Sequence, residues 1–89
     1  MKKVMMFSSP TCAPCKMLKP LMETEANRRT FVLEIYDMKS ANAPIFAQYG
    51  VRAAPTVICV EDGMEVGRFI GSQSAANIES ILTEWGFAL

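Results

Sequence analysis

The sequence predicts an α/β fold, a four-stranded mixed sheet formed in the order β-α-β-α-β-β-α with helices on both faces. Residues 4–7 are a continuously apolar run, typical of a strand covered on both faces, and a helical pattern follows it. Residues 56–60 form a second such run directly after a proline, and Asp62-Gly63 joins it to a further β-like run. We therefore expect a right-handed crossover between the first two strands and a hairpin between the last two.

The composition is that of a small globular protein. The 89 residues, 51% hydrophobic and 20% charged, predict a single domain over residues 1–89. Nine basic and nine acidic residues give a net charge of zero, which removes the basic patch that non-specific nucleic-acid binding needs. No apolar run approaches the roughly 18 residues of a membrane span, and none forms a signal-peptide core. We expect a cytoplasmic monomer with no nucleic-acid or membrane partner.

The first helix is predicted to open at Cys12 and to end near Asn27, because apolar residues recur there at helical spacing. Pro20 lies inside this helix and should kink it, since proline lacks a backbone donor and crowds the carbonyl of Lys16. The apolar face is predicted to consist of Met17, Leu18, Leu21 and Met22, and the core is expected to include Met5, Met6, Met17 and Met22.

The next two elements are a strand and a short helix. Residues 31–36 are β-branched and aromatic enough to form the second strand. A short helix then follows, with Ser40 or Asn42 as its cap and Gly50 at its end. Its apolar face is predicted to hold Ile45, Phe46 and Tyr49.

The last part of the chain is predicted to be a hairpin followed by a helix. Asp62-Gly63 indicates a tight two-residue turn, because Gly readily supplies the positive φ that such a turn needs. Strand 56–60 should therefore pair antiparallel with strand 64–70. The final helix is capped by Ser74, ended by Gly86 and faces inward with Ala75, Ile78, Ile81, Leu82 and Trp85.

The candidate chemistry lies in the segment Cys12-Ala13-Pro14-Cys15, at a strand-to-helix junction. Unpaired N–H groups and the helix dipole at this junction stabilise a thiolate at Cys12. Cys15 follows about one turn later, near enough to attack a mixed disulfide formed at Cys12. Pro14 restricts the loop and holds the pair near disulfide geometry. Cys12 is therefore the candidate nucleophile and Cys15 the candidate resolving cysteine.

Two other interpretations of the cysteine pair are weaker. A purely structural disulfide across so short a loop removes little entropy from the unfolded chain. A closed zinc site needs four ligands, whereas the chain adds only Cys59, no His and carboxylates, so we expect no metal. A zinc site shared across a dimer stays open. Cys59 lies mid-strand and is expected to be a small buried hydrophobe, while Lys16 and Lys19 are expected to be solvated.

Three segments resemble the thioredoxin family, in the family's order and at near-family spacing. They are residues 12–20 (CAPCKMLKP), 49–56 (YGVRAAPT) and 67–71 (GRFIG). The resemblance extends from Val4 to Trp85. It implies the thioredoxin fold, without the family's usual N-terminal strand and helix, and it implies thiol-disulfide oxidoreductase activity with no cofactor beyond the Cys12–Cys15 disulfide.

The resemblance also implies a substrate-binding surface around the cysteine pair. Pro55 matches the family's cis-proline, which packs against the dithiol, and Ala54 matches the residue whose backbone pairs with an extended substrate segment. A cis bond there would leave backbone groups free to receive a peptide strand. Gly71, Pro14 and Thr11 complete the implied surface. Thr11 stands where the family usually has a tryptophan, so one apolar wall is reduced.

Three further positions depart from the family pattern. Ala13 replaces a glycine, Met6 stands where the family usually has a buried aspartate, and Leu33 lies at about the place of that aspartate's lysine partner. The aspartate assists proton transfer at the second cysteine. We therefore hypothesise that Cys15 gives up its proton to water or substrate without a protein base.

The predicted function is reduction of disulfide-containing protein substrates, with a thioredoxin-reductase-type flavoprotein as donor and ribonucleotide reductase as one acceptor. A glutathione-based donor, as in glutaredoxin-like proteins, is the alternative within the same chemistry. Against it, the chain lacks the Cys-Pro-Tyr-Cys signature and has Gly71-Ser72 where those proteins usually have paired glycines. An alternative from another class is a non-catalytic binding module with a thioredoxin fold, and a metal carrier is a third.

Overall fold

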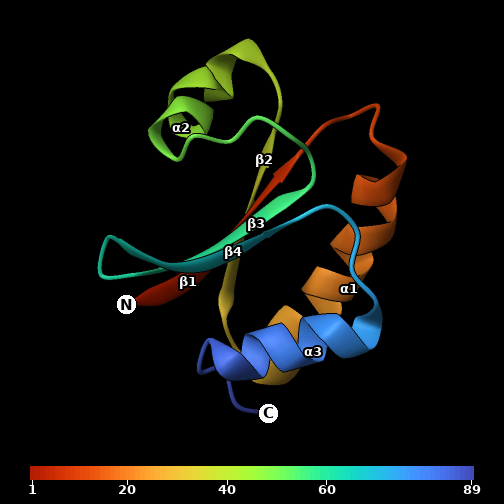
Figure 1. The fold of residues 1–89 in the computed structure, drawn as a ribbon, viewed down its shortest axis with the longest axis vertical. Helices are drawn as coiled ribbons and strands as arrows, with labels where there is room; N and C mark the ends of the chain where they lie inside the picture. Colours follow the sequence, from red (N-terminus) through yellow and green to blue (C-terminus); the bar gives the residue numbers. More distant parts are fainter.

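The computed structural model describes residues 1–89 and contains the predicted elements in the predicted order (Figure 1). The chain forms four strands, three α-helices and one short 3₁₀ helix, η1. Their bounds are β1 Lys2–Ser8, α1 Ala13–Arg29, β2 Val32–Asp37, η1 Ser40–Asn42, α2 Ala43–Gln48, β3 Thr56–Glu61, β4 Met64–Ile70 and α3 Ala75–Glu84.

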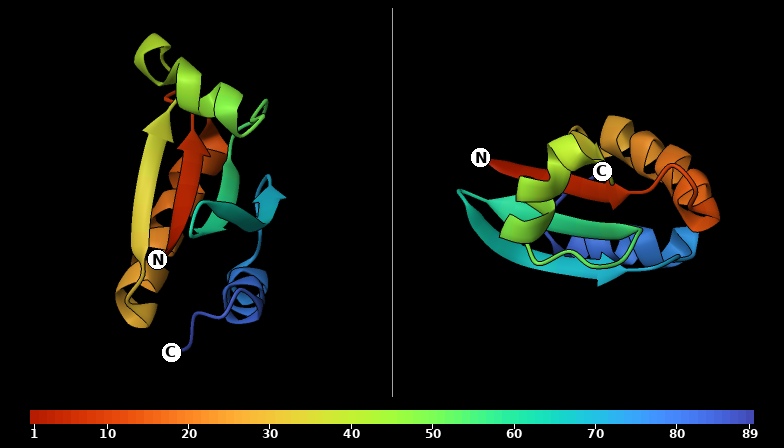
Figure 2. Two further views of the ribbon diagram at one scale, coloured as in Figure 1. Left: turned by 90° about the vertical axis from the view of Figure 1, so that its left-hand side faces the viewer. Right: turned by 90° about the horizontal axis from the view of Figure 1, so that it is seen from above.

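The strands form one mixed sheet in the spatial order β2-β1-β3-β4. β1 is parallel to β2 and antiparallel to β3, and β3 is antiparallel to β4, which confirms the predicted crossover and hairpin. α1 and α3 lie against one face, while α2 lies across the other face near the carboxyl ends of β1 and β2 (Figure 2). Both faces of the two central strands are therefore covered.

The apolar residues of β1 alternate between two clusters, one on each face of the sheet. Val4 and Met6 point toward α1 and α3, whereas Met5 and Phe7 point toward α2. All four side chains are buried, which explains the continuous apolar run at residues 4–7. The buried members of the first cluster, called here the α1/α3 cluster, are Val4, Met6, Cys15, Leu18, Met22, Val57, Cys59, Phe69, Ile78, Leu82 and Phe87.

Most of the predicted turns and caps are present. Asp62 and Gly63 both have positive φ, 52° and 82°, so they form the predicted two-residue hairpin turn. The Ser74 hydroxyl caps α3 by accepting a hydrogen bond from the Asn77 N–H at 3.1 Å. Asn42, one of the two residues predicted to cap α2, is its N-cap residue, but it makes no side-chain capping hydrogen bond. Its side chain donates to the Asp37 carbonyl instead.

The predicted inward positions of α1 and α3 are correct in part. Leu18 and Met22 are buried, and α1 continues past Pro20 to Arg29. Met17, however, is 74% exposed and Leu21 37% exposed. Ala75 at the start of α3 is also exposed, whereas Ile78 and Leu82 are buried and Ile81 and Trp85 half-buried, as expected. The expectation that Met17, Leu21 and Ala75 lie on inward faces is wrong. They line open depressions between α1 and α3, because the two helices do not close over this gap.

A buried ion pair connects α1 to the carboxyl end of the chain. The Arg29 Nε donates to Glu25 at 2.7 Å, and the Arg29 Nη1 donates to the Phe87 carbonyl at 2.7 Å and to the Thr83 hydroxyl at 3.0 Å. Arg28, which is largely exposed, adds a second hydrogen bond to Glu25 at 2.6 Å. Every polar group of this network is thus satisfied, which is the condition for burying charge without a large cost.

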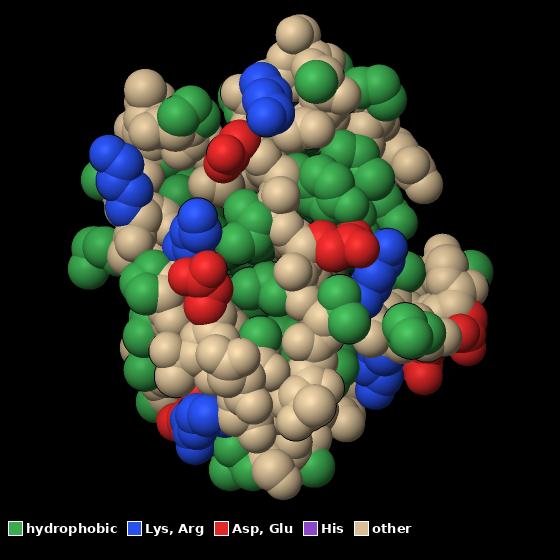
Figure 3. Space-filling view, turned by 180° about the vertical axis from the view of Figure 1, so that it is seen from behind, with side chains coloured by type: hydrophobic (Ala, Val, Ile, Leu, Met, Phe, Trp, Pro, Cys, Tyr) green, Lys and Arg blue, Asp and Glu red, His purple; other side chains and the backbone are tan.

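The surface of the molecule mixes charges of both signs. On the face shown in Figure 3, Lys and Arg side chains alternate with Asp and Glu, and apolar side chains lie between them. The amino terminus forms an ion pair with Asp62 of the hairpin turn. None of the α-helices combines the length and the apolar composition that a membrane-spanning segment requires.

We predict that Arg29→Met lowers the free energy of unfolding by about 3 kcal/mol, because it leaves the buried Glu25 carboxylate short of a partner. Urea denaturation would measure the loss. Arg28→Met is the matched control, since Arg28 is 45% exposed and its ion pairs are screened by water, so its loss of stability should be clearly smaller. Equal losses in the two variants would contradict the importance of the buried pair.

The ion pairs of Glu25 should make the fold less stable at low pH. Burial acts to raise the pKa of Glu25, but the hydrogen bonds and charges of Arg29 and Arg28 outweigh it and lower the pKa. Since the folded pKa lies below the unfolded value, the carboxylate stabilises the fold above the unfolded pKa, and this contribution is lost as the pH falls through the folded pKa. We expect Glu25→Gln to lose less stability than the wild type between about pH 5 and pH 3, as measured by urea denaturation. If the unfolding free energies of the wild type and of Glu25→Gln fell equally over this pH range, the assignment would be contradicted.

Candidate functional site

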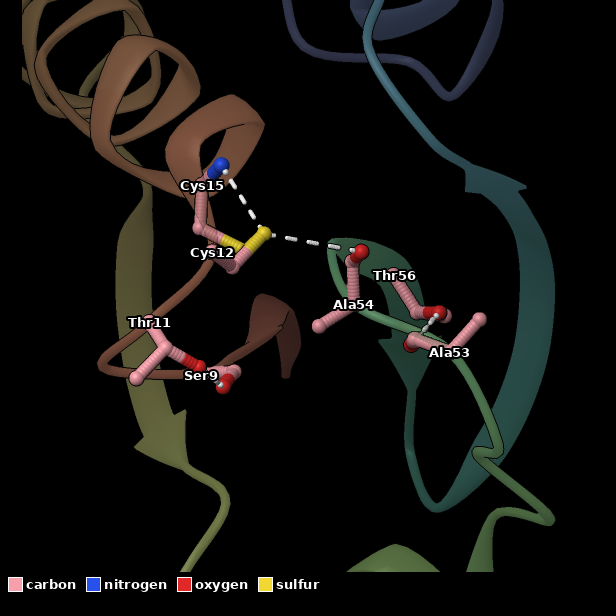
Figure 4. Close-up of a disulfide and its surroundings, with 7 residues drawn as sticks. All are labelled: Ser9, Thr11, Cys12, Cys15, Ala53, Ala54 and Thr56. Carbon is pink, nitrogen blue, oxygen red and sulfur yellow. Dashed lines mark hydrogen bonds between the residues drawn. A yellow bond between two sulfur atoms is a disulfide. The ribbon is translucent and has the colours of Figure 1, made fainter.

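The two cysteines lie at the amino-terminal end of α1 and form a disulfide (Figure 4). Their Cα atoms are 5.2 Å apart, within the range that suits such a bond. Cys12 is the N-cap of α1, and its Sγ accepts a hydrogen bond from the Cys15 N–H at 3.2 Å. The N-cap position places the sulfur of Cys12 on the unpaired N–H groups of the first turn, where a negative charge is stabilised.

The two sulfur atoms differ in their access to solvent. Cys12 is partly exposed, whereas Cys15 is 2% exposed and belongs to the α1/α3 cluster. An incoming disulfide can therefore reach Cys12 from outside. Cys15 is protected from external partners and lies within reach of Cys12 alone, which suits the predicted division into nucleophile and resolving cysteine.

The segment before β3 forms the opposite side of the site. The Ala54–Pro55 peptide bond is cis, and the Ala54 carbonyl oxygen lies 3.6 Å from the Cys12 Sγ (Figure 4). The Thr56 hydroxyl donates to the Ala53 carbonyl at 2.7 Å and fixes the turn. Gly71, with φ of 86°, donates its N–H to the Pro55 carbonyl at 2.8 Å. The backbone of the loop that ends at Cys12, of residues 53–56 and of Gly71 thus comes together beside the disulfide.

The predicted site residues occupy different parts of this surface. Ala54 lies across from Cys12, and Gly71 is bonded to the adjacent Pro55 carbonyl, while the role of these residues in substrate binding stays a prediction. Pro14 is exposed in the first turn of α1, on the side that faces Ser72. Thr11 is also exposed, but its hydroxyl lies 3.4 Å from the Ser9 hydroxyl on the loop after β1, so it adds a polar edge to the site.

Cys59 lies outside the site. It is fully buried in β3 with a free thiol, which confirms the sequence prediction. Burial raises the pKa of this thiol, with Lys2 acting in the opposite direction and Glu61 adding to the rise. No three His, Cys, Asp or Glu side chains gather where they could bind a metal ion.

One feature beside the disulfide was not predicted from the sequence. Met17 and Leu21 line a depression of about 320 Å³ that also touches Pro14, Ser72 and Gln73. The helical spacing of apolar residues assigned Met17 and Leu21 to the core. Nothing in the sequence distinguishes an apolar residue that packs inward from one that stays on the surface next to a functional site.

The cluster that buries Cys15 is apolar. Met6 is fully buried within the α1/α3 cluster, and Leu33 packs against the cluster from β2. The buried carboxylate of α1, Glu25, is bonded to Arg28 and Arg29. The hypothesis that Cys15 gives up its proton to water or substrate is compatible with this apolar setting and stays a prediction.

Comparison with known proteins identifies relatives that are all thioredoxins. The family model described as "Thioredoxin" matches residues 1–84. A thioredoxin of Chlamydia caviae is 33% identical over 79 residues, which cover 88% of this chain and 76% of that protein. A thioredoxin of Porphyra purpurea is 29% identical over 80 residues, or 89% of this chain and 75% of that protein.

Solved structures agree with the fold. The crystal structure of thioredoxin f2 from Chlamydomonas reinhardtii gives a TM-score of 0.88 at 18% identity, over 99% of this chain and 82% of that one. The thioredoxin of Fasciola hepatica gives a TM-score of 0.84 at 28% identity, over 93% of this chain and 79% of that one.

We predict that Met6→Asp speeds the attack of Cys15 on a mixed disulfide, because a carboxylate in the α1/α3 cluster could accept the Cys15 proton. Stopped-flow release of a chromophoric thiol from Cys12, followed from about pH 6 to pH 9, would measure the step. Met6→Asn is the matched control, because the Asn side chain has the same size as Asp and is also polar but cannot accept the proton. Equal rates in the two folded variants across this range would contradict the hypothesis.

Proposed function

The chain belongs to the thioredoxin family of thiol-disulfide oxidoreductases, whose redox group is the cysteine pair itself, and on that premise we propose that it reduces disulfide bonds in proteins. Cys12 acts as the nucleophile and Cys15 as the resolving cysteine. The observation that best supports this division is the Cys15 N–H donated to the Cys12 Sγ at the start of α1, with Cys12 accessible and Cys15 buried.

The proposed reaction moves two electrons and two protons from the dithiol to the substrate. The Cys12 thiolate attacks one sulfur of the substrate disulfide, whose S–S bond breaks, and the other substrate sulfur leaves as a thiolate that takes up a proton. Cys15 then loses its proton and attacks the Cys12 Sγ. The mixed disulfide breaks, the second substrate thiolate is protonated, and the Cys12–Cys15 disulfide remains.

The proposed substrate surface consists of Ala54, Pro55 and Gly71 beside Cys12, together with Pro14 and Thr11. The partial exposure of Ala54 and its distance of 3.6 Å from the Cys12 Sγ support this role. An extended substrate segment bonded to Cys12 would lie along this backbone and pair with it as an added strand.

We propose a thioredoxin-reductase-type flavoprotein as the donor that returns two electrons and two protons to the disulfide. Ribonucleotide reductase or another protein disulfide is the acceptor, and glutathione is the competing donor. A reductant of this kind works where thiols are kept reduced, so we propose that it acts in the cytoplasm as a monomer.

Substitution of each cysteine should give a different result. Cys15→Ser should accumulate a covalent mixed disulfide with a protein substrate such as insulin, because the resolving thiol is missing. Cys12→Ser should form no such adduct and should lower turnover to the uncatalysed rate, because Cys15 is buried. Mass spectrometry of the non-reduced protein would detect the adduct.

Coupled NADPH consumption measures turnover and identifies the donor. One assay contains thioredoxin reductase and the other contains glutathione with glutathione reductase, each with a disulfide substrate. Turnover with thioredoxin reductase alone is the expected result. Turnover with glutathione alone would replace the proposed donor, and full biological activity of Cys12→Ser would instead favour a non-catalytic binding module.

A further inference from the structure

The depression between α1 and the start of α3 is an apolar surface next to the disulfide. Its volume is about 320 Å³, at the small end of the range for ligand sites in proteins. Met17, which lines it, is 74% exposed. No lining residue is charged, and the full set is Pro14, Met17, Leu18, Pro20, Leu21, Ser72 and Gln73.

We propose that this depression binds one large apolar side chain of the disulfide-bearing protein that Cys12 attacks. The chain would then prefer substrates in which an aliphatic or aromatic residue lies close to the reacting cysteine. This inference rests on the proposed function, because the bound side chain reaches the depression only when its own chain is held at Cys12.

Continuity with the reaction site supports this occupant. Pro14, which lines the depression, lies between the two cysteines in the chain. Ser72, on the opposite wall, directly follows Gly71, whose N–H is bonded to the Pro55 carbonyl. An extended peptide advances about 3.3 Å per residue, so a residue two positions from the reacting cysteine lies roughly 7 Å away along the chain. In the proposed arrangement, the residues next to the reacting cysteine of a substrate bonded to Cys12 lie at the mouth of the depression.

The chemistry of the surrounding surface determines where an apolar side chain can go. Thr11 and Ser9 place two hydroxyl groups on the loop at the other side of Cys12. Farther along α1 and α3, the gap between the helices is crossed by the Arg28–Glu79 ion pair at 3.3 Å. The uncharged surface is therefore limited to the part next to Pro14, which has room for a single large side chain.

Binding of an apolar side chain in the depression would be favourable because it buries apolar surface that is otherwise exposed to water. Met17 lies in water in the free protein, and its flexible thioether side chain adapts to partners of different shape. Contact with an apolar substrate side chain would remove both surfaces from water, at roughly 25 cal/mol for each Å² buried. Met17 is therefore a specificity-determining residue for the proposed reaction, and it has no part in the bond exchange itself.

The test uses matched peptide disulfides that differ at one position. Phe or Ser is placed two residues before or two residues after the reacting cysteine, and 2-hydroxyethyl disulfide serves as a small substrate without an anchor. Met17→Gln replaces the apolar surface with a polar side chain of similar length. Met64→Gln is the matched control, because Met64 is 73% exposed but lies at the start of β4, at the opposite end of the sheet from the cysteines.

For the wild type and Met64→Gln, kcat/KM should be about tenfold higher for Phe than for Ser in at least one placement. For Met17→Gln, the ratio should fall to about twofold, with unchanged activity on 2-hydroxyethyl disulfide. A wild-type ratio near one, or an undiminished ratio in Met17→Gln, would overturn this inference and leave the proposed function in place. Wild-type protein that reduces neither the peptides nor the small disulfide would overturn both.

Discussion

The pairing of β1 with β3 is the constraint on which the rest of the site depends. Phe7, near the end of β1, lies opposite Thr56 at the start of β3. Because the two strands run in opposite directions, the loop that leaves β1 and the loop that enters β3 lie at the same end of the sheet. One loop ends at Cys12 and the other contains Ala54, so the strand register brings the two loops together, and the Ala54 carbonyl oxygen lies 3.6 Å from the Cys12 Sγ. A shift of one residue would reverse every side chain of β1 and destroy both clusters.

The register is fixed by burial on both faces of β1. Val4 and Met6 fit the α1/α3 cluster, while Phe7 packs against Phe46 of α2 with ring centroids 5.0 Å apart. The same arrangement determines the setting of Cys15, which α1 places in the α1/α3 cluster near the apolar residues of β1 and β3. The structural core and the buried half of the redox pair are thus one cluster, so the resolving cysteine is held in position by the packing that stabilises the fold.

The elements of the fold could be predicted because each has a local signal. The Asp62-Gly63 turn, the Ser74 cap and the apolar run of β1 depend on neighbouring residues only. The exposure of Met17 and the burial of Arg29 depend on partners far along the chain. Helical spacing shows which residues share a face, but it does not show how much of that face another helix will cover. Likewise, the Arg29 Nη1 is bonded to the Phe87 carbonyl, 58 positions later, and no pattern around residue 29 indicates that contact.

The two ends of the molecule use their polar groups in different ways. At the end away from the cysteines, the Lys2 Nζ donates to the Trp85 carbonyl at 2.7 Å and lies 5.0 Å from the centre of the Phe87 ring. Together with the bonds of Arg29, these contacts attach the carboxyl end of the chain to β1 and α1. At the cysteine end, the partly exposed Ala54 and the apolar surface of Met17 face solvent. A binding surface must leave such groups free, and the polar contacts that attach the carboxyl end of the chain accordingly lie at the other end of the molecule.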